Sequence, residues 1–224
     1  MFREGLGFRE LLPTWIIPRK ERTQGGSPPK ADCRSAFFMN IFQHILNRSL
    51  AHVTRFSSKP QHFQESVAEH SFFVAYIATI MCELLEKDGE KIDKEKAIEM
   101  ALAHDMEEMF SGDILGPFKH KLPEVSVAIR TLNQEMIKEV FADLPQDLAR
   151  HFISLWEEEG QRQTTEAQIV KVADTLSLIA KCAEEVKVGN TFFQEMYESQ
   201  LKLLQNYNAE WWEKIKNQIL NTKY

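Results

Sequence analysis

The side chains best suited to chemistry are two histidines and two aspartates from three separate places in the chain. They are His70, the adjacent pair His104–Asp105, and Asp174. Imidazole nitrogens and carboxylate oxygens together form a donor set that suits divalent transition metals such as Mn, Fe, Co, Ni or Zn. Four protein ligands around an ion that prefers six leave positions open for water and substrate. The set therefore indicates a hydrolytic metal site.

Each of these residues also has a purely structural interpretation. Asp174 stands among apolar residues, where a buried carboxylate costs free energy unless a partner compensates it, and an arginine or a hydroxyl would serve as well as a metal. The pair His104–Asp105, taken alone, is most simply a core histidine beside a surface aspartate. Its acidic neighbours Glu108 and Asp113 favour the metal interpretation, because they gather negative charge where a cation is stabilised.

A phosphate group that reaches such a site needs further positive charge, since two aspartate ligands already neutralise a divalent ion. The candidates are Arg55, Lys119 and Lys171. Arginine is the better bidentate clamp for phosphate, and Arg55 lies in a loop-like stretch from which it would project into a cleft. A solvated surface arginine is the alternative. Glu107 is interpreted as an ordinary solvated residue.

From residue 39 onward the chain is expected to be helical, because apolar residues recur at helical spacing. Ser66 and Glu69 form a capping box, which predicts a helix that carries His70 in its first turn and runs to about Lys87.

Asp93 suits the cap of a further helix that continues through Phe110. This helix would carry His104 and Asp105 near its end and would place Glu108 on the same face.

Thr165 and Gln168 form a second capping box, which predicts a helix to about Lys187 with Asp174 in its middle. The sequence shows no credible strand, no internal repeat and no glycine-rich phosphate loop.

Residues 1–38 differ in composition from the rest, with several prolines, a Gly-Gly-Ser run and an excess of basic residues. They are expected to form a disordered extension before a domain that spans residues 39–224.

The overall composition is that of a soluble globular chain, with 43% hydrophobic residues, 27% charged residues and a net charge of -6 over 224 residues. The negative charge argues against nucleic acid or an anionic membrane as the main partner. No apolar run approaches the roughly 20 residues that span a bilayer. The three cysteines form no CxxC pair, so we expect a reducing, cytoplasmic location.

Taken together, these residues resemble the HD-domain metal-dependent phosphohydrolases, whose motif order H…HD…D is met by His70, His104–Asp105 and Asp174. The resemblance is closer to the small 5′-deoxynucleotidases of bacteria and eukaryotes. It covers roughly residues 40–205 and is carried by SVAEHSFFVA (66–75), ALAHDMEEMFSGDILGPFK (101–119) and IVKVADTLSL (169–178).

The resemblance implies an all-α fold, an HD-domain helical bundle in a single domain, and a homodimer. It also implies that one divalent transition metal ion (Mn, Co, Fe, Ni or Zn) is ligated by His70, His104, Asp105 and Asp174.

By position, Glu108 and Asp113 match catalytic residues of the family that work near the attacking water and the phosphate. Arg55, fifteen residues before His70, matches the substrate-binding arginine. Lys119 would offset charge on the phosphoryl oxygens.

Two further positions come from the same resemblance. Glu159, fifteen residues before Asp174, matches another carboxylate of the substrate site. The family often has a tryptophan after the arginine, whereas this chain has Phe56, which would contact the sugar. The smaller ring leaves the choice between ribose and deoxyribose open.

The implied activity is hydrolysis of (deoxy)nucleoside 5′-monophosphates, a small-molecule substrate, to nucleoside and phosphate. Three alternatives stay open: an HD hydrolase of nucleoside triphosphates or guanosine polyphosphates, a non-catalytic nucleotide- or metal-binding regulator, and a purely structural helical protein.

Overall fold

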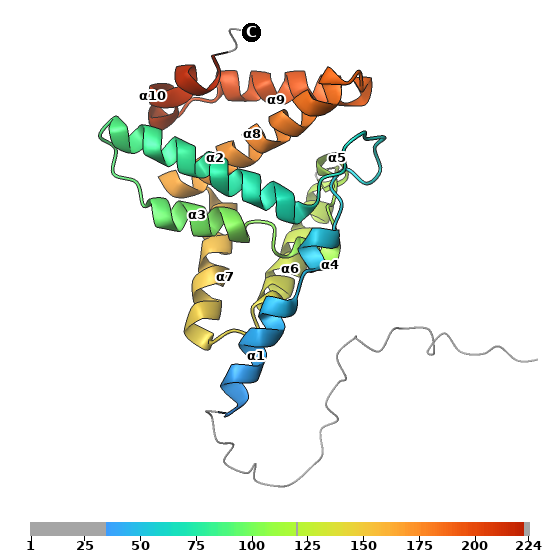
Figure 1. Ribbon diagram of the computed structural model, residues 1–224, viewed down its shortest axis with the longest axis vertical. Helices are drawn as coiled ribbons and strands as arrows, with labels where there is room; N and C mark the ends of the chain where they lie inside the picture. Colours follow the sequence, from blue (N-terminus) through green and yellow to red (C-terminus); the bar gives the residue numbers. More distant parts are fainter. Residues whose placement is uncertain (1–34, 120, 222–224) are drawn as a thin grey trace, which may run out of the picture. The chain divides into compact units, whose positions relative to one another are not determined.

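The computed structural model describes residues 35–119 and 121–221, and this part of the chain is built from helices, with no strand (Figure 1). The elements are α1 (Ser35–Leu46), a 3-10 helix (Ser49–His52), α2 (Val67–Lys87), α3 (Lys94–Ala103), α4 (Glu108–Ser111), α5 (Gly116–Lys119), α6 (Pro123–Val140), α7 (Gln146–Gln161), α8 (Thr165–Lys187), a second 3-10 helix (Thr191–Phe193), α9 (Gln194–Asn206) and α10 (Glu210–Ile219). The predicted all-α class is therefore confirmed.

Of the predicted disordered extension, residues 1–38, the first 34 residues lie outside the described part of the chain. The described residues from Ser35 onward belong to one compact unit, and α1 already begins at Ser35. The boundary at residue 39 stays a prediction.

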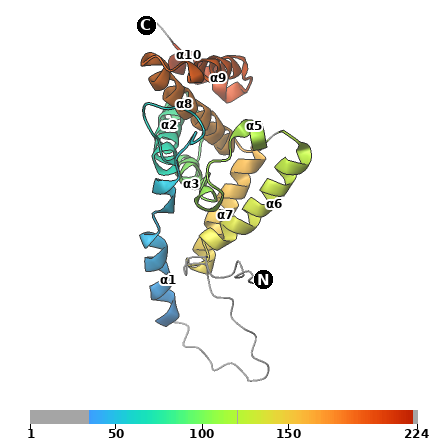
Figure 2. The same ribbon diagram turned by 90° about the vertical axis from the view of Figure 1, so that its right-hand side faces the viewer.

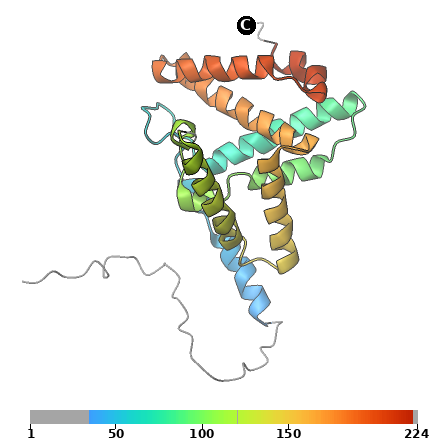
Figure 3. The ribbon, with the colours of Figure 1, turned by 180° about the vertical axis from the view of Figure 1, so that it is seen from behind.

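The core is organised around α2 and α8, which cross each other and together carry half of the buried residues in the described part of the chain (Figure 1). Helix α3 packs on both of them, and seen from behind, α8 also lies against α9 (Figure 3). Buried residues of α2 recur every three or four positions, for example Val74, Ala78, Met81 and Leu85. This spacing gives one apolar face to the core.

The capping box at the start of α2 is confirmed. The Ser66 amide donates to Oε2 of Glu69 at 2.7 Å, and the Glu69 amide donates to Oγ of Ser66 at 3.2 Å. These bonds satisfy amides that a helix start leaves free, so they fix where α2 begins and hence where His70 lies in its first turn.

Helix α2 is also, within the described ranges, the only one long and apolar enough to cross a membrane, with a mean hydropathy of 1.3. Its buried residues, however, contact α3 and α8 inside the protein. We therefore interpret α2 as a core helix.

The predicted helix from Asp93 through Phe110 is wrong in its second half. Asp93 does cap α3 by accepting the Lys96 amide, but α3 ends at Ala103. The following amides reach back only three residues, as in the 3.0 Å bond from Glu108 to the Asp105 carbonyl. Residues 104–107 therefore form a turn, and Glu108 begins a separate short helix.

The second predicted capping box is also wrong, by one residue. Thr164, not Thr165, is the cap of α8, and its hydroxyl accepts the Ala167 amide at 3.3 Å. Gln168 is not free to complete a box, because its side-chain oxygen accepts a hydrogen bond from Trp211. The extent of α8, to Lys187, is as predicted.

Candidate metal centre

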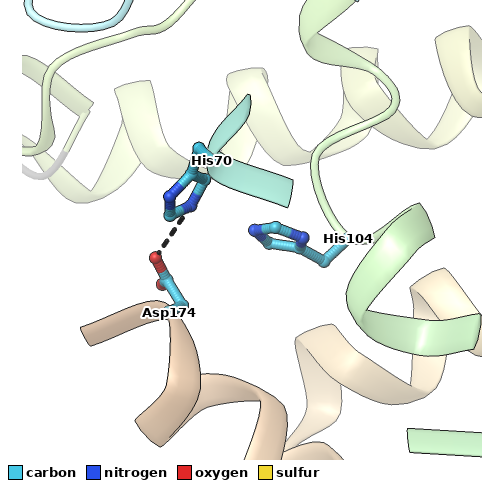
Figure 4. A group of neighbouring side chains, drawn as sticks. All are labelled: His70, His104 and Asp174. Carbon is cyan, nitrogen blue, oxygen red and sulfur yellow. Dashed lines mark ion pairs between the residues drawn. The ribbon is translucent and has the colours of Figure 1, made fainter. Parts of the chain in front are cut away.

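Three helices bring the predicted donors together (Figure 4). His70 comes from the first turn of α2, His104 from the residue that directly follows α3, and Asp174 from the middle of α8. One ligand atom from each of the three lies within 4.8 Å of the others. Asp105 adjoins this group, with Oδ2 at 3.0 Å from Nε2 of His104 and 3.7 Å from Nε2 of His70.

The spacing of these atoms fits a divalent cation. Donors that bind one ion at about 2.0–2.2 Å lie roughly 3–3.5 Å from one another. Nε2 of His70 lies 3.2 Å from Oδ1 of Asp174, close to that separation. Nε2 of His70 and Nε2 of His104 are both buried and have no hydrogen-bond partner in the described part of the chain. Burying such an atom costs free energy unless a ligand compensates it, so both nitrogens are suited to a metal.

The electrostatics of the group also favour positive charge. Burial lowers the pKa of His104, but the carboxylates of Asp105 and Asp174 outweigh it and raise this pKa to about 10. Burial raises the pKa of Asp105, yet His104 and His70 lower it to about 2. The cluster therefore stabilises a cation and keeps its carboxylates ionised.

Contacts behind the donors orient two of them. Nδ1 of His104 lies 2.7 Å from the Ala101 carbonyl and donates to it, so a neutral His104 ring that ligates a metal would present the lone pair of Nε2 to the cluster. Nζ of Lys171 lies 2.6 Å from Oδ2 of Asp174, which leaves Oδ1 toward His70.

A cavity of about 580 Å³ opens beside the cluster. Its walls include α6 and α7, which meet at the turn that joins them and diverge toward their other ends (Figure 2). Six of the residues named as candidates for the site line this cavity: His104, Asp105, Lys119, Glu159, Lys171 and Asp174. Its volume lies in the range of small-molecule sites.

Other predicted site residues lie apart from this cavity. Arg55 does not project into a cleft: it is only 8% exposed, and its Nη1 pairs with Oε2 of Glu65 at 2.6 Å. Phe56 is buried, and its ring packs edge-on against Phe193. The guanidinium remains close to the metal cluster, because Nη1 also lies 2.9 Å from Nδ1 of His70.

The structure also describes the two predicted catalytic carboxyls, Asp113 and Glu108. Oδ2 of Asp113 accepts the backbone amide of Phe56 at 2.8 Å. Oε2 of Glu108 is buried without a hydrogen-bond partner in the described part of the chain. Burial, reinforced by Asp105 and Asp113, raises the pKa of Glu108 to about 9. Glu108 therefore holds a proton near neutral pH when no cation is present.

The expectation that Glu107 is solvated is wrong, because its side chain is buried and lines the cavity. Oε1 accepts a hydrogen bond from Asn133 at 3.2 Å, and Oε2 accepts one from Trp156 at 2.7 Å. The carboxylate thus ties α6 and α7 to the turn that follows His104. The break in α3 turns Glu107 inward, and helical spacing alone does not reveal that break.

Sequence reasoning missed several polar residues around the site. Arg130 and Arg162 line the cavity, and their spacing along the chain carried no signal. Ser177 is different: its Oγ lies 3.0 Å from Nδ1 of His70, and it follows Asp174 by three residues on α8. That spacing places the two on one helix face and was visible in the sequence.

Comparison with known proteins identifies what this arrangement is similar to. A family model described as 5′-deoxynucleotidase YfbR-like matches residues 41–222. A 5′-deoxynucleotidase of Vibrio vulnificus is 29% identical over 69% of this chain and 78% of its own length. One of Photorhabdus laumondii is 31% identical over 58% of this chain and 66% of its own length.

Solved structures give the same fold. An HD-domain phosphohydrolase of Listeria innocua is 26% identical with a TM-score of 0.69, over 83% of this chain and 90% of its own. The cyanophage S-2L HD phosphohydrolase DatZ, bound to dA and one catalytic Zn²⁺ ion, is 19% identical with a TM-score of 0.51, over 81% of this chain and 94% of its own. The likeness to DatZ concerns the fold alone.

Proposed function

Because the chain belongs to the YfbR-like 5′-deoxynucleotidase family, we propose that it hydrolyses (deoxy)nucleoside 5′-monophosphates to nucleoside and phosphate. One observation carries this proposal: two histidines and two aspartates from three segments converge at the wall of a cavity sized for a small molecule. Such a donor set beside a cavity is typical of metal-assisted hydrolysis.

We propose His70, His104, Asp105 and Asp174 as the ligands of one divalent transition metal ion. When bound, the ion would supply Lewis-acid activation of water and of the phosphoryl group. Mixed nitrogen and oxygen donors accept Mn, Co, Fe, Ni or Zn. The zinc bound by the DatZ fold neighbour supports a divalent ion in this fold without selecting one.

Glu108 is proposed to manage the proton of the reaction. As a water oxygen forms its bond to phosphorus and the bond from phosphorus to the 5′-oxygen breaks, one proton must leave the water and one must reach the departing oxygen. A cation bound beside it would favour the ionised form of Glu108, and its buried, unpartnered Oε2 is then suited to accept the first proton and to pass it on. Asp113 works beside it, with Oδ2 holding the turn that carries Arg55 and Phe56.

The substrate would lie in the cavity beside the donors. Lys119 lines this cavity and would offset charge on the phosphoryl oxygens, while Glu159 lines it as well. Arg55 is the proposed phosphate clamp: it does not line the cavity, but it lies beside the metal cluster, with Nη1 2.9 Å from Nδ1 of His70. A contact between Phe56 and the sugar is also proposed, from the resemblance alone, because its buried ring packs against Phe193 and does not line the cavity.

The test is phosphate release from a panel of nucleoside 5′-monophosphates, before and after metal removal and reloading. Activity that disappears with the metal, returns with it and is lost in Asp105→Asn supports the proposal. The matched control is Asp143→Asn, at an exposed aspartate. Nucleotide binding without phosphate release under every metal would instead indicate a regulator. An Asp105→Asn protein with wild-type activity would contradict the assignment of Asp105 as a metal ligand.

A second candidate substrate class is favoured by the cavity wall. Arg130 and Arg162 line the cavity, and neither forms an ion pair with a carboxylate in the described part of the chain. Two free arginines beyond the cluster suit substrates with more phosphate groups, such as nucleoside triphosphates or guanosine polyphosphates. Arg130→Gln and Arg162→Gln should then reduce activity on triphosphates more than on monophosphates.

A homodimer and a cytoplasmic location remain proposals. The dimer is supported by exposed aromatic side chains on one face of α2, namely Phe72, Phe73 and Tyr76. A monomer in analytical ultracentrifugation at micromolar concentration would contradict it.

A further inference from the structure

Nδ1 of His70 has two neighbours with different hydrogen-bonding abilities. Oγ of Ser177 lies at 3.0 Å, and Nη1 of Arg55 lies at 2.9 Å. His70, Ser177 and Arg55 are all buried. A hydroxyl can donate or accept a hydrogen bond, whereas a guanidinium can only donate.

The contact with Arg55 therefore requires a lone pair on Nδ1. In a neutral imidazole the proton must then lie on Nε2, the nitrogen that faces Asp174 (Figure 4). The same nitrogen lies 3.7 Å from Oδ2 of Asp105. Ligation of a metal through Nε2 requires the opposite tautomer, with the lone pair on Nε2 and the proton on Nδ1.

In the ligating tautomer the N–H at Nδ1 needs an acceptor. Arg55 offers none, while Oγ of Ser177 is at hydrogen-bond distance. His104 shows the corresponding arrangement in a simpler form, because its Nδ1 faces only the Ala101 carbonyl. His70 thus has a built-in acceptor and a competing donor at one atom.

We infer that Ser177 is the positioning residue that sets His70 for metal ligation, and that cation binding at Nε2 releases Arg55 from Nδ1. The inference rests on the metal site of the proposed function. A metal on Nε2 of His70 and the contact between Arg55 and Nδ1 then exclude each other. The guanidinium of Arg55 therefore becomes free to bind an anion only in the metal-loaded protein.

The released guanidinium would not leave the site. Its Nη1 is also paired with Oε2 of Glu65 at 2.6 Å, and this pair does not depend on the His70 tautomer. Burial lowers the pKa of Arg55, but Glu65, Asp174 and Asp105 raise it above its ordinary value, so Arg55 stays charged beside the cluster. The expected order of binding is therefore metal first and phosphate second.

The first test is titration of the full-length, metal-free protein with Zn²⁺ alone. Ser177→Ala should weaken zinc binding by about 10–100-fold, the usual effect of losing a contact behind a metal ligand. Ser71→Ala is the matched control, because it removes another buried hydroxyl that bonds only the Val67 carbonyl. Ser177→Thr, which keeps the hydroxyl, should restore most of the affinity.

A variant that is expected to raise the zinc affinity complements this test. Arg55→Met combined with Glu65→Gln removes the competing donor without leaving Glu65 as an unpaired charge, and it should tighten zinc binding. Ser177→Ala with unchanged zinc affinity, or a double variant that binds zinc more weakly, would overturn the inference.

The second test reads the tautomer directly in the wild-type protein. Nitrogen-15 NMR of the His70 ring should show the proton on Nε2 without metal and on Nδ1 with Zn²⁺ bound. A proton on Nδ1 in both states would contradict the release of Arg55. Zinc binding with the expected tautomers but no phosphate release would reject the proposed function alone, and a protein that binds no zinc would reject both.

Discussion

The backbone amide of Phe56 donates a 2.8 Å hydrogen bond to Oδ2 of Asp113, which joins two segments separated by 57 residues. Phe56 has a φ of 52°, a left-handed backbone conformation that residues other than glycine rarely adopt. The amide of Arg55 is held as well, by the Glu65 carbonyl at 2.9 Å. Asp113 therefore helps to fix the turn that holds Arg55 beside His70.

Asp113→Ala should loosen this turn. The partly buried amide of Phe56 would lose its acceptor, at a cost of about 1 kcal/mol in the free energy of unfolding. We expect phosphate release to fall while zinc affinity is retained, because Asp113 is not among the four donors. Loss of zinc binding in a folded Asp113→Ala protein would contradict this assignment.

The carboxylate of Glu185 should make the free energy of unfolding depend on pH. The side chain is fully buried, and burial raises its pKa, but hydrogen bonds from the amides of His62 and Phe63 and from Lys181 and Asn190 lower the pKa to about 2. Below its unfolded value of 4.5 the unfolded chain binds more protons than the folded one. This contribution is therefore complete above pH 4.5 and is lost as the pH falls toward 2.

The corresponding variant is Glu185→Gln, measured by denaturant unfolding from pH 7 to pH 3. It should lose about 3–5 kcal/mol at pH 7, because it leaves the buried Lys181 without its carboxylate, and it should show a smaller further loss in acid. Glu184→Gln, at the exposed neighbour, should change little. An unchanged acid slope in Glu185→Gln would contradict the assignment.

Glu107 should matter for stability more than a solvated glutamate would. Glu107→Ala leaves the side-chain N–H groups of Asn133 and Trp156 without an acceptor, and each such loss costs about 1–3 kcal/mol. Hydrogen exchange should rise in α6 and α7, which Glu107 joins to the turn after His104. Glu157→Ala, on the same cavity wall but exposed, serves as the control.

Metal binding should be visible as thermal stabilisation. The cluster has buried, unpartnered nitrogens in the folded chain, and a ligand that binds only the folded state raises stability by about 2.7 kcal/mol at 100 times its Kd. The Tm should fall with a chelator and rise with added zinc or manganese in a concentration-dependent way. The same Tm under both conditions would show that the cluster holds no ion.

The helices that carry the donors were predictable because their signals are local. The capping box at Ser66 and Glu69 and the cap at Asp93 depend on residues three positions apart, and both are present as predicted. The pattern of His70, His104–Asp105 and Asp174 was visible for the same reason, since each lies within a periodic apolar segment.

What the sequence concealed depends on contacts between distant segments. The break after Ala103 rotates Glu107 inward, and its partners Asn133 and Trp156 lie on other helices. Arg55 is buried by an ion pair with Glu65 rather than exposed in a loop. Such partners are chosen by packing, and no short-range pattern encodes them.

The most direct test of the account is the metal content of the purified full-length protein, measured by elemental analysis in wild type and in Asp174→Ala. Four donors from three segments predict one divalent ion per wild-type chain, and less metal together with lost phosphate release in the variant. A folded Asp174→Ala protein with the metal content and phosphatase activity of wild type would contradict it.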